Sequence, residues 1–411
     1  MSTPVCRFCQ HPLTHVFVDL GMSPLSNAYL SGRDLLKMEP FYPLKVFVCE
    51  KCFLVQLPEF ETPENIFSDY AYFSSVSDSW LAHCRAYAGA ITPRLALGPR
   101  SLVMEVASND GYLLQFFKQS GIPVLGIEPA ANVAKAAEQS GIPTVVRFFG
   151  AAAADALVAD GKSADLLIGN NVLAHVPRLN DFVEGLRRAL KPAGVLTMEF
   201  PHLARLMEHR QFDTIYHEHF SYLSFSTVRR VFEAHGLSLF DVDEIPTHGG
   251  SLRIYAQRSD APGRPVTPAV AALLDREAAE GMNRLEHYLG FDARVAGVKR
   301  DLLAFLIRAR GEGRSVVGYG AAAKGNTLLN YCGIRGDFLD YVADRSPHKQ
   351  GKHLPGTHLP IVPPEHIRET RPDYVLILPW NIRAEVMEQM AFIREWGGQF
   401  VVPIPQLEIL P

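Results

Sequence analysis

Short apolar runs alternate with amphipathic stretches through the middle of the chain. Residues 101–106, 124–127 and 195–200 are apolar runs that predict buried strands, and residues 181–190 have the period of an amphipathic helix. Strands that alternate with helices in this way are typical of an α/β domain built on a parallel sheet.

The same pattern returns near the carboxyl terminus. Residues 315–320 form an apolar run that enters a glycine-bearing turn, and residues 339–344 form a second run that ends in an acid. A linker at residues 262–268 comes earlier, and residues 269–310 have helical periodicity with a break at Gly290. We therefore expect a second Rossmann-like unit, joined to the first through two helices.

The composition is that of a water-soluble globular protein. The chain has 411 residues, 47% hydrophobic and 20% charged, with a formal net charge of -4. This length exceeds one typical core, so we expect two domains and a smaller appendage. The sequence has neither the clustered basic excess of a nucleic-acid binder nor the apolar run of about 20 residues that would cross a membrane. The amino terminus has no signal-peptide pattern, so we expect a cytoplasmic protein.

Four of the six cysteines form two close pairs. Cys6 and Cys9 form one CxxC pattern, and Cys49 and Cys52 form a second. Thiolates in this arrangement close a tetrahedral cage around zinc, whereas the alternatives are two reducible vicinal disulfides or unconnected thiols. We favour zinc because cytosolic thiols stay reduced. A cage with four protein ligands has no open position for water, so this zinc would be structural.

The turn after the first apolar run has the chemistry of an adenosyl site. Glu105 ends the first run, and Glu128 ends the second. A strand-terminal acid such as Glu128 accepts hydrogen bonds from ribose hydroxyls. The turn contains Asn109, Asp110 and one glycine, and it lacks the GxGxxG pattern that lets a pyrophosphate approach closely. This deficit favours S-adenosylmethionine (SAM), which carries no phosphate, over a dinucleotide.

The polar and aromatic stretch TIYHEHFSY at residues 214–222 is the candidate chemical centre. It places His217, Glu218 and His219 next to one another, too many titratable side chains for an ordinary core segment. A strand would point both histidines to the same face, whereas a loop would impose no such order. The alternative is a pair of partly exposed structural histidines. The strand predicted at residues 195–200 runs toward this stretch, which we therefore expect at the same sheet edge as the adenosyl site.

Two segments carry further candidate contacts to a ligand. Asn170, Asn171 and His175 follow an apolar run, which places them at the carboxyl edge of the predicted sheet. His248 and Arg253 surround a glycine-bearing turn. There they would meet an anionic or polyhydroxylated ligand, or the segment would be a plain hairpin.

The second Rossmann-like unit has a better phosphate cradle than the first. Its glycine-bearing turn at residues 318–325 contains Lys324 and is followed by Asn326, at a predicted helix amino terminus. Glycines, a helix amino terminus and a lysine together favour a diphosphate. The chain therefore has two nucleotide-type units, for two different ligands.

Together these motifs resemble one family, the nucleotide-sugar C-methyltransferases. The motifs are the four cysteines, YAYFSS (70–75), EVASNDGYLL (105–114), GIEPA (126–130), YHEHFSY (216–222), THGGSLR (247–253) and YGAAAKGNTLLNYCGI (319–334). One departure is Ala322, where the family pattern has proline. Members of the family methylate dTDP-linked 4-keto-deoxysugars, and the resemblance spans essentially the whole chain.

The resemblance implies three domains in a defined order. It implies a zinc-binding module at residues 1–66, a class I SAM-methyltransferase domain at 67–262, and linker helices with a Rossmann-like nucleotide-sugar-binding domain at 263–411. The cofactors would be SAM and a structural zinc ion. The substrate would be methylated at a carbon next to the ketone, C3 in preference to C5. We expect a monomer or a weak oligomer that binds a small-molecule nucleotide sugar.

The resemblance also assigns roles to individual residues. His219 would abstract the proton, with Tyr216, Glu218, Tyr70 and His175 nearby. The residues expected to bind the cofactor are Tyr72, Phe73, Glu105, Ala107, Asn109, Asp110, Glu128, Asn170 and Asn171. The residues expected to bind the sugar nucleotide are His248, Arg253, Lys324 and Asn326.

Other functions remain open at this point. An NAD-dependent oxidoreductase or epimerase would use the second Rossmann-like unit and the HEH stretch. A zinc-scaffolded protein would bind nucleotide sugars without turnover. A catalytic metal at the HEH stretch is disfavoured because it has no third ligand at helical spacing.

Overall fold

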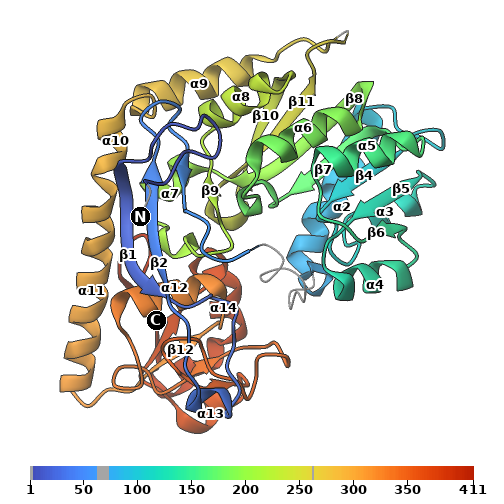
Figure 1. Ribbon diagram of the computed structural model, residues 1–411. Helices are drawn as coiled ribbons and strands as arrows, with labels where there is room; N and C mark the ends of the chain where they lie inside the picture. The colour runs from blue at the N-terminus through green and yellow to red at the C-terminus, as the bar shows by residue number, and fades with distance from the viewer. Residues whose placement is uncertain (1–2, 63–73, 262) are drawn as a thin grey trace. The chain divides into compact units, whose positions relative to one another are not determined.

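The computed structural model describes residues 3–62, 74–261 and 263–411, and its contacts divide the chain into two compact units. The first comprises Met1–Leu13, Cys49–His202 and Phe220–Asn283. The second comprises Thr14–Val48, Leu203–His219 and Arg284–Pro411. Figure 1 labels the elements of both units. No helix of the described residues has the length and apolar composition of a membrane span.

A seven-stranded sheet is the centre of the first unit, with the strand order β10-β11-β8-β7-β4-β5-β6. Its strands are β4 (Val103–Val106), β5 (Val124–Ile127), β6 (Thr144–Val145), β7 (Ala164–Asn170), β8 (Leu190–Pro201), β10 (Leu237–Ile245) and β11 (Ser251–Arg258). The five strands from β8 to β6 are parallel, and β11 pairs antiparallel with both β8 and β10. This order places the carboxyl ends of β4, β5, β7 and β8 along one edge.

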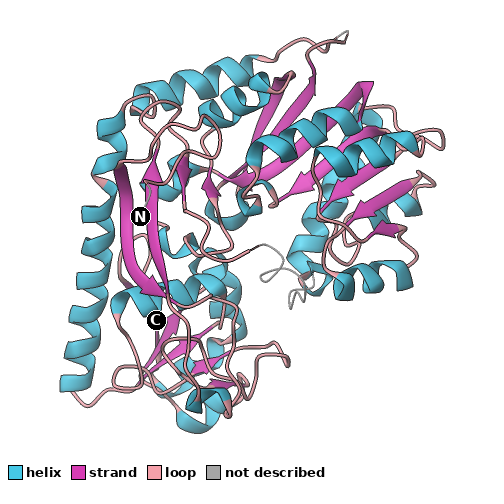
Figure 2. Cartoon of the chain, viewed as in Figure 1, coloured by secondary structure: helices cyan, strands magenta, loops and turns pink. Residues whose placement is uncertain are grey.

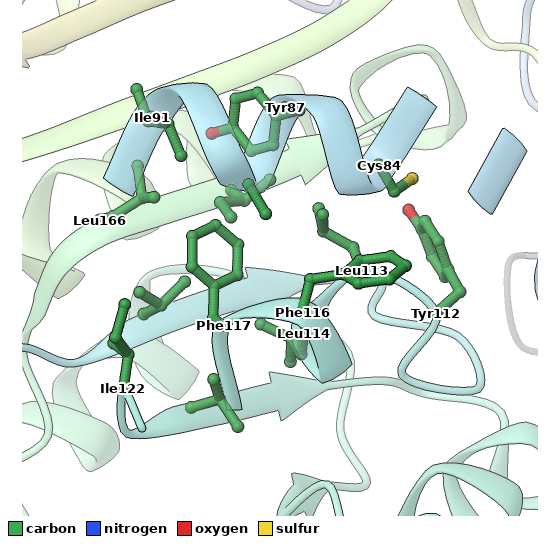
Figure 3. Close-up of a cluster of buried hydrophobic side chains, with 14 of the residues drawn as sticks. Cys84, Tyr87, Ile91, Tyr112, Leu113, Leu114, Phe116, Phe117, Ile122 and Leu166 are labelled. Carbon is green, nitrogen blue, oxygen red and sulfur yellow. The ribbon is translucent and has the colours of Figure 1, made fainter. Parts of the chain in front are cut away.

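Helices alternate with the strands of this sheet (Figure 2), as the apolar pattern predicted. They are α2 (Asp78–Arg94), α3 (Leu114–Gln119), α4 (Ala131–Gln139), α5 (Ala151–Ala159), α6 (Leu179–Ala189), α8 (Phe225–Ala234) and α9 (Pro268–Glu280). Figure 3 shows Tyr87 and Ile91 of α2 in one buried cluster with Phe117 of α3 and Leu166 of β7. Because these strands are covered on both faces, their sequences are continuous apolar runs.

Both cysteine pairs belong to the first unit, together with the short antiparallel pair β3 (Val55–Gln56) and β9 (Ser221–Tyr222). The segment between the cysteine pairs belongs to the second unit. It contains the antiparallel strands β1 (His15–Ser23) and β2 (Tyr42–Val48).

The second unit has a six-stranded sheet with the order β14-β13-β12-β15-β16-β17. Its strands are β12 (Val316–Tyr319), β13 (Val342–Ala343), β14 (Ile361–Val362), β15 (Tyr374–Ile377), β16 (Gln399–Val402) and β17 (Glu408–Leu410). All are parallel except β17. The order reverses between β12 and β15, which is the point where open α/β sheets bind ligands. The predicted second Rossmann-like unit is therefore present.

The remaining helices are α7 (Leu203–Glu208), α10 (Leu285–Leu289), α11 (Phe291–Gly311), α12 (Ala323–Cys332), α13 (His366–Thr370) and α14 (Arg383–Gln389). Gly290 separates α10 from the long helix α11, at the break that the sequence predicted (Figure 1). We expected two connecting helices, but the chain forms α9, α10 and α11 there. The additional break follows α9, where Gly281 adopts a left-handed conformation with φ of 92°.

Candidate functional site

The four predicted zinc ligands lie together. Their sulfur atoms are all within 4.8 Å of one another, and the closest pairs are 3.5 to 3.6 Å apart. A tetrahedral site with Zn–S bonds of about 2.3 Å places its sulfurs about 3.8 Å apart, so the geometry fits zinc. None of these cysteines forms a disulfide. The cysteines Cys6, Cys9, Cys49 and Cys52 therefore form a four-thiolate site, as predicted, with no open position for catalysis.

The turn after β4 is compact and brings the predicted adenosyl contacts together. Ala107 and Asn109 have φ of 57° and 49°, in the left-handed region. Glu128 at the end of β5 accepts hydrogen bonds from the N–H groups of Asn109 and Ala130, each 2.9 Å long. A carboxylate oxygen accepts more than one hydrogen bond, so Glu128 retains capacity for ribose hydroxyls. The turn thus fits a nucleoside without phosphates.

Burial dominates the electrostatics at this edge. It raises the pKa of Glu105 well above the usual range, an effect that Tyr112 opposes and the nearby carboxylates strengthen. Burial also raises the pKa of Glu128, although its two backbone hydrogen bonds oppose the rise. The side chain of Asn170 is buried at the end of β7, and its Nδ2 atom has no hydrogen-bond partner among the described residues. A buried donor without a partner costs about 1–3 kcal/mol, so this position favours a polar ligand such as SAM.

Asn109 and Asp110 also hold the chain that follows residues 63–73. Asn109 Oδ1 accepts a 2.9 Å hydrogen bond from the N–H of Ser74, and Asp110 Oδ2 accepts one of 3.1 Å from Ser75. The expected contacts Tyr70, Tyr72 and Phe73 lie outside the described residues.

At the edge formed by β7, β8 and β11, Asn171 and His248 come together. Asn171 Nδ2 lies 3.1 Å from His248 Nε2, and the Trp80 ring centroid lies 5.6 Å from that of His248. The short 3₁₀ segment Thr247–Gly249 connects β10 to β11. Within it, His248 has φ of 54°, in the left-handed region. His175 ends another short 3₁₀ helix at Leu173–His175, half-buried.

Arg253 is bound to a carboxylate that the sequence reasoning missed. Its Nε and Nη2 atoms lie 2.7 and 2.6 Å from Oε1 of Glu199, which is 1% exposed. His83 Nε2 lies 2.9 Å from Oε2 of the same carboxylate and stacks on Trp80. Burial would raise the pKa of Glu199, but His83 and Arg253 outweigh it and lower the pKa. The available signal was an acid near the end of an otherwise apolar strand, β8.

The boundary between the two units falls inside the candidate chemical centre: His219 belongs to the second unit and Phe220 to the first. Residues Phe212–Thr214 form a short 3₁₀ helix, and the histidines follow in a turn, so the loop alternative holds rather than the strand. His219 Nδ1 lies 2.7 Å from the carbonyl oxygen of Thr214. Because a carbonyl only accepts, Nδ1 carries a proton in this hydrogen bond, which makes Nε2 the nitrogen of the ring that can act as a base. The Tyr216 ring packs against this ring at an interplanar angle of 35°, with centroids 4.1 Å apart.

The other histidine of the turn has different surroundings. His217 is 3% exposed, its Nε2 lies 3.3 Å from the carbonyl of Pro43, and its ring packs edge-on against Tyr42. Burial lowers its pKa. His217 therefore packs against β2 in a buried position, whereas the ring of His219 is held through Nδ1 by the Thr214 carbonyl.

Glu218 is buried, with 5% of the residue exposed. Its Oε1 accepts a 2.6 Å hydrogen bond from Nδ2 of Asn27, which opposes but does not cancel the effect of burial. Burial raises the pKa of Glu218 to about 7. Near neutral pH this carboxyl therefore exists in both protonation states.

Glu218 is expected to make the chain less stable as pH rises. Its pKa is about 7 in the folded chain against 4.5 for an ordinary glutamate, so the folded state holds a proton that the unfolded state releases. The stabilisation is full below pH 4.5 and is lost as pH rises through 7, a difference of about 3 kcal/mol. Glu218→Gln should therefore stabilise the chain at pH 8 and change little at pH 4.5, measured by urea denaturation. The exposed Glu233→Gln is the control, and equal gains for both variants would contradict the assignment.

A buried polar cluster fixes the turn to the sheet of the second unit. Asp213 is 0% exposed, and its Oδ2 accepts a 2.7 Å hydrogen bond from the indole N–H of Trp380. Burial raises the pKa of Asp213 to about 6, although the charge of Lys324 opposes the rise. Lys324 Nζ donates to Oδ1 of Asn381 at 2.7 Å, and Thr327 Oγ1 donates to the Ile215 carbonyl at 2.9 Å. The segment that begins after β12 and the turn at residues 214–219 are thus joined by hydrogen bonds within the second unit.

Three family models match consecutive parts of the chain. They are described as "Putative zinc binding domain" (residues 6–67), "Methyltransferase domain" (80–242) and "C-methyltransferase C-terminal domain" (246–405). The C-methyltransferase NovU of Streptomyces niveus is 35% identical over 405 residues, which cover 98% of this chain and 96% of NovU. The chain belongs to the C-methyltransferase family. The resemblance inferred from the motifs is confirmed.

Two further similarities are more limited. An uncharacterized methyltransferase of Mycobacterium leprae is 26% identical over 99 residues, 24% of this chain and 36% of the relative. The magnesium protoporphyrin IX methyltransferase of Synechocystis PCC 6803, solved with bound SAM, is 17% identical and covers 48% of this chain and 89% of its own, with a TM-score of 0.33. A likeness at this level carries no argument about chemistry.

Family membership settles the broad class of cofactor and reaction. This C-methyltransferase has a SAM-binding methyltransferase domain and a zinc-binding module with the cysteine cage described above. These matches favour a methyltransferase over both the NAD-dependent oxidoreductase and the non-catalytic binding protein.

Proposed function

We propose that the chain transfers a methyl group from SAM to a carbon next to the ketone of a nucleotide-linked 4-keto-deoxysugar, at C3 in preference to C5. The hydrogen bond from His219 Nδ1 to the Thr214 carbonyl carries the proposal, because it places a proton on Nδ1 and so assigns the role of base to Nε2. The 35% identity to NovU over nearly the whole chain supports carbon methylation.

The chemistry needs a base and a stabilised oxyanion. A C–H bond beside a ketone is a weak acid, so His219 Nε2 takes the proton while a donor stabilises the enolate oxygen. Tyr216, His175 and Tyr70 are the candidates for that donor, and Tyr216 is already in contact with the imidazole. SAM, when bound, supplies a methyl group activated by a sulfonium. Glu218, held by Asn27, would bind a sugar hydroxyl.

Asn326 and Lys324 are proposed to hold the nucleotide part of the substrate. The Asn326 side chain is 0% exposed, and neither of its polar atoms has a hydrogen-bond partner among the described residues. Such an amide favours a polar ligand, because each unpaired group costs about 1–3 kcal/mol. Lys324 follows the loop after β12, and burial lowers its pKa against the opposing charge of Asp213.

The proposal is tested by separating deprotonation from methylation. The chain is incubated in D₂O with a panel of 4-keto nucleotide sugars and S-adenosylhomocysteine (SAH), and NMR follows solvent deuterium into the sugar. We expect exchange at one carbon beside the ketone, and a new methyl at that same carbon when SAM replaces SAH. Binding of NAD with no binding of SAH would overturn the proposal in favour of an oxidoreductase.

Glu128→Ala is expected to weaken SAH binding at least tenfold in calorimetry. The variant loses the acceptor for ribose hydroxyls, and hydrogen bonds to a charged group contribute about 1.5–3 kcal/mol each. Glu138→Ala on the exposed side of α4 is the matched control and should bind SAH as the parent does. Equal affinities for all three proteins would remove Glu128 from the cofactor site.

A further inference from the structure

Arg7 lies in the turn between the zinc ligands Cys6 and Cys9. Its backbone N–H donates a 2.9 Å hydrogen bond to Oε1 of Gln56 in β3, while Nε2 of Gln56 donates to Cys6 Sγ at 3.2 Å. Gln56 thus joins β3 to the turn Cys6–Cys9, called the zinc knuckle below, through one backbone atom and one ligand sulfur. Groups that hydrogen-bond to metal ligands orient them.

The guanidinium of Arg7 reaches three separate segments of the first unit. Nη2 donates to the carbonyl of Leu57, and Nη1 donates to the carbonyl of Pro177 at 3.4 Å. The guanidinium carbon lies 5.5 Å from the ring centroid of Phe220, within cation–π range. A planar guanidinium serves such divergent acceptors because its donors have fixed directions.

Two of these segments lead directly to candidate catalytic histidines. Phe220 is 1% exposed, donates its N–H to the Ala174 carbonyl at 2.7 Å and accepts from the Leu57 N–H at 3.0 Å. Ala174 is joined to His175 by one peptide bond, and Phe220 is joined to His219 by another. The contacts of Arg7 therefore surround the backbone that carries both rings.

The knuckle itself is held against the methyltransferase domain from two helices. Asn180 of α6 donates from Nδ2 to the carbonyl of Phe8 at 2.9 Å, and Thr227 of α8 donates to the carbonyl of Cys52 at 3.3 Å. The cage is thus fixed at both cysteine pairs, which makes Arg7 a rigidly mounted side chain.

We propose that Arg7 is a positioning residue that couples the zinc knuckle to the segments bearing His175 and His219. The zinc-binding module then serves catalysis as well as stability, because it sets the backbone from which the imidazoles project. This inference rests on the proposed role of His219. It predicts that loss of the guanidinium releases Phe220 and the Leu57 and Pro177 carbonyls while the four thiolates remain.

Arg7→Met in the full, zinc-loaded chain is the test. The variant keeps an unbranched side chain that fills the place of the aliphatic part of arginine, and it removes the guanidinium donors. We expect one zinc per chain and SAH affinity within about twofold of the parent, with kcat lower by about tenfold to hundredfold, as for a small misplacement of reacting groups. Hydrogen–deuterium exchange should rise in peptides covering residues 173–178 and 219–223, and in the peptide containing Leu57, and stay constant in the rest of the first unit. Arg7→Lys, which restores the charge and one donor, should recover part of kcat.

Arg230→Met is the matched control. Arg230 is exposed and lies over the ring of Phe53 in the second cysteine knuckle, with 5.6 Å from guanidinium carbon to centroid, so it has the same kind of contact without reaching the histidine segments. It should leave kcat and exchange unchanged. Unchanged exchange in both peptides, or a rise spread evenly over the first unit in Arg7→Met and in Arg7→Lys, would overturn the coupling. The exchange measurement needs no turnover, so it decides the coupling even where the sugar panel yields no methylated product.

Discussion

His219→Asn should lower kcat for methyl transfer by about 10²–10⁴-fold and abolish deuterium exchange beside the ketone. The Thr214 carbonyl fixes the protonated nitrogen of the His219 ring, so the Nε2 lone pair is the basic site, and asparagine has no basic nitrogen to replace it. SAH affinity should stay within about twofold, because the proposed cofactor contacts are those of Glu128 and its neighbours. Initial rates, NMR exchange and calorimetry on the same preparation provide the three measurements.

His217→Asn is the matched control for this variant, since it changes the same side chain two residues earlier. His217 contacts Pro43 and Tyr42 in a buried setting. Its replacement should therefore lower the free energy of unfolding and leave kcat close to that of the parent. Turnover of His219→Asn within about tenfold of the parent is too small a loss for a missing general base and would assign that role to another residue. A larger loss of kcat in His217→Asn than in His219→Asn would exchange the two assignments.

Cys49→Ser should release the zinc and lower the melting temperature by about 10 °C or more. Loss of one ligand opens a cage whose sulfurs are mutually within 4.8 Å, and the three remaining cysteines then lose a shared metal. Structural zinc is part of the folding free energy, and even about 3 kcal/mol corresponds to roughly 10 °C for a domain of this size. Metal analysis and thermal unfolding of the same samples measure both effects.

Cys84→Ala is the control for the loss of a thiol. Cys84 is buried in the cluster between α2 and α3, and burial raises the pKa of its thiol, so it is a packed side chain rather than a metal ligand. This variant should retain one zinc per chain with a smaller change in melting temperature. A Cys49→Ser variant that keeps its zinc and its melting temperature would show that Cys49 is not needed to bind a stabilising metal.

Local features of the sequence predicted several strands of both sheets and the four zinc ligands. The apolar runs that form β4, β5, β7 and β8 are continuous because both faces of these strands are covered. The local pattern of the sequence therefore predicts their burial. The CxxC pairs predicted the thiolate cage because ligand spacing within each pair is itself local. Glu128 at a strand end and the turn without GxGxxG indicated a cofactor without phosphates for the same reason.

Contacts between distant segments were decided only by the tertiary structure. His217 and His219 look equivalent in the sequence, and their difference comes from Pro43 and Tyr42 on one side and the Thr214 carbonyl on the other. Arg253 remains a predicted contact to the substrate, and only the structure showed that its guanidinium binds Glu199, on the neighbouring strand β8.

The sequence by itself therefore determined the strands, the zinc ligands and the candidate chemistry of the HEH turn, since each depends on neighbouring residues. The tertiary structure decided which imidazole is held through Nδ1 by a backbone carbonyl, which charges neutralise one another, and that Arg7 contacts Phe220 across more than 200 positions of the chain. The physical reason is that hydrogen bonds and burial depend on atoms that are close in space. Periodicity along the chain does not predict which distant segment supplies the partner.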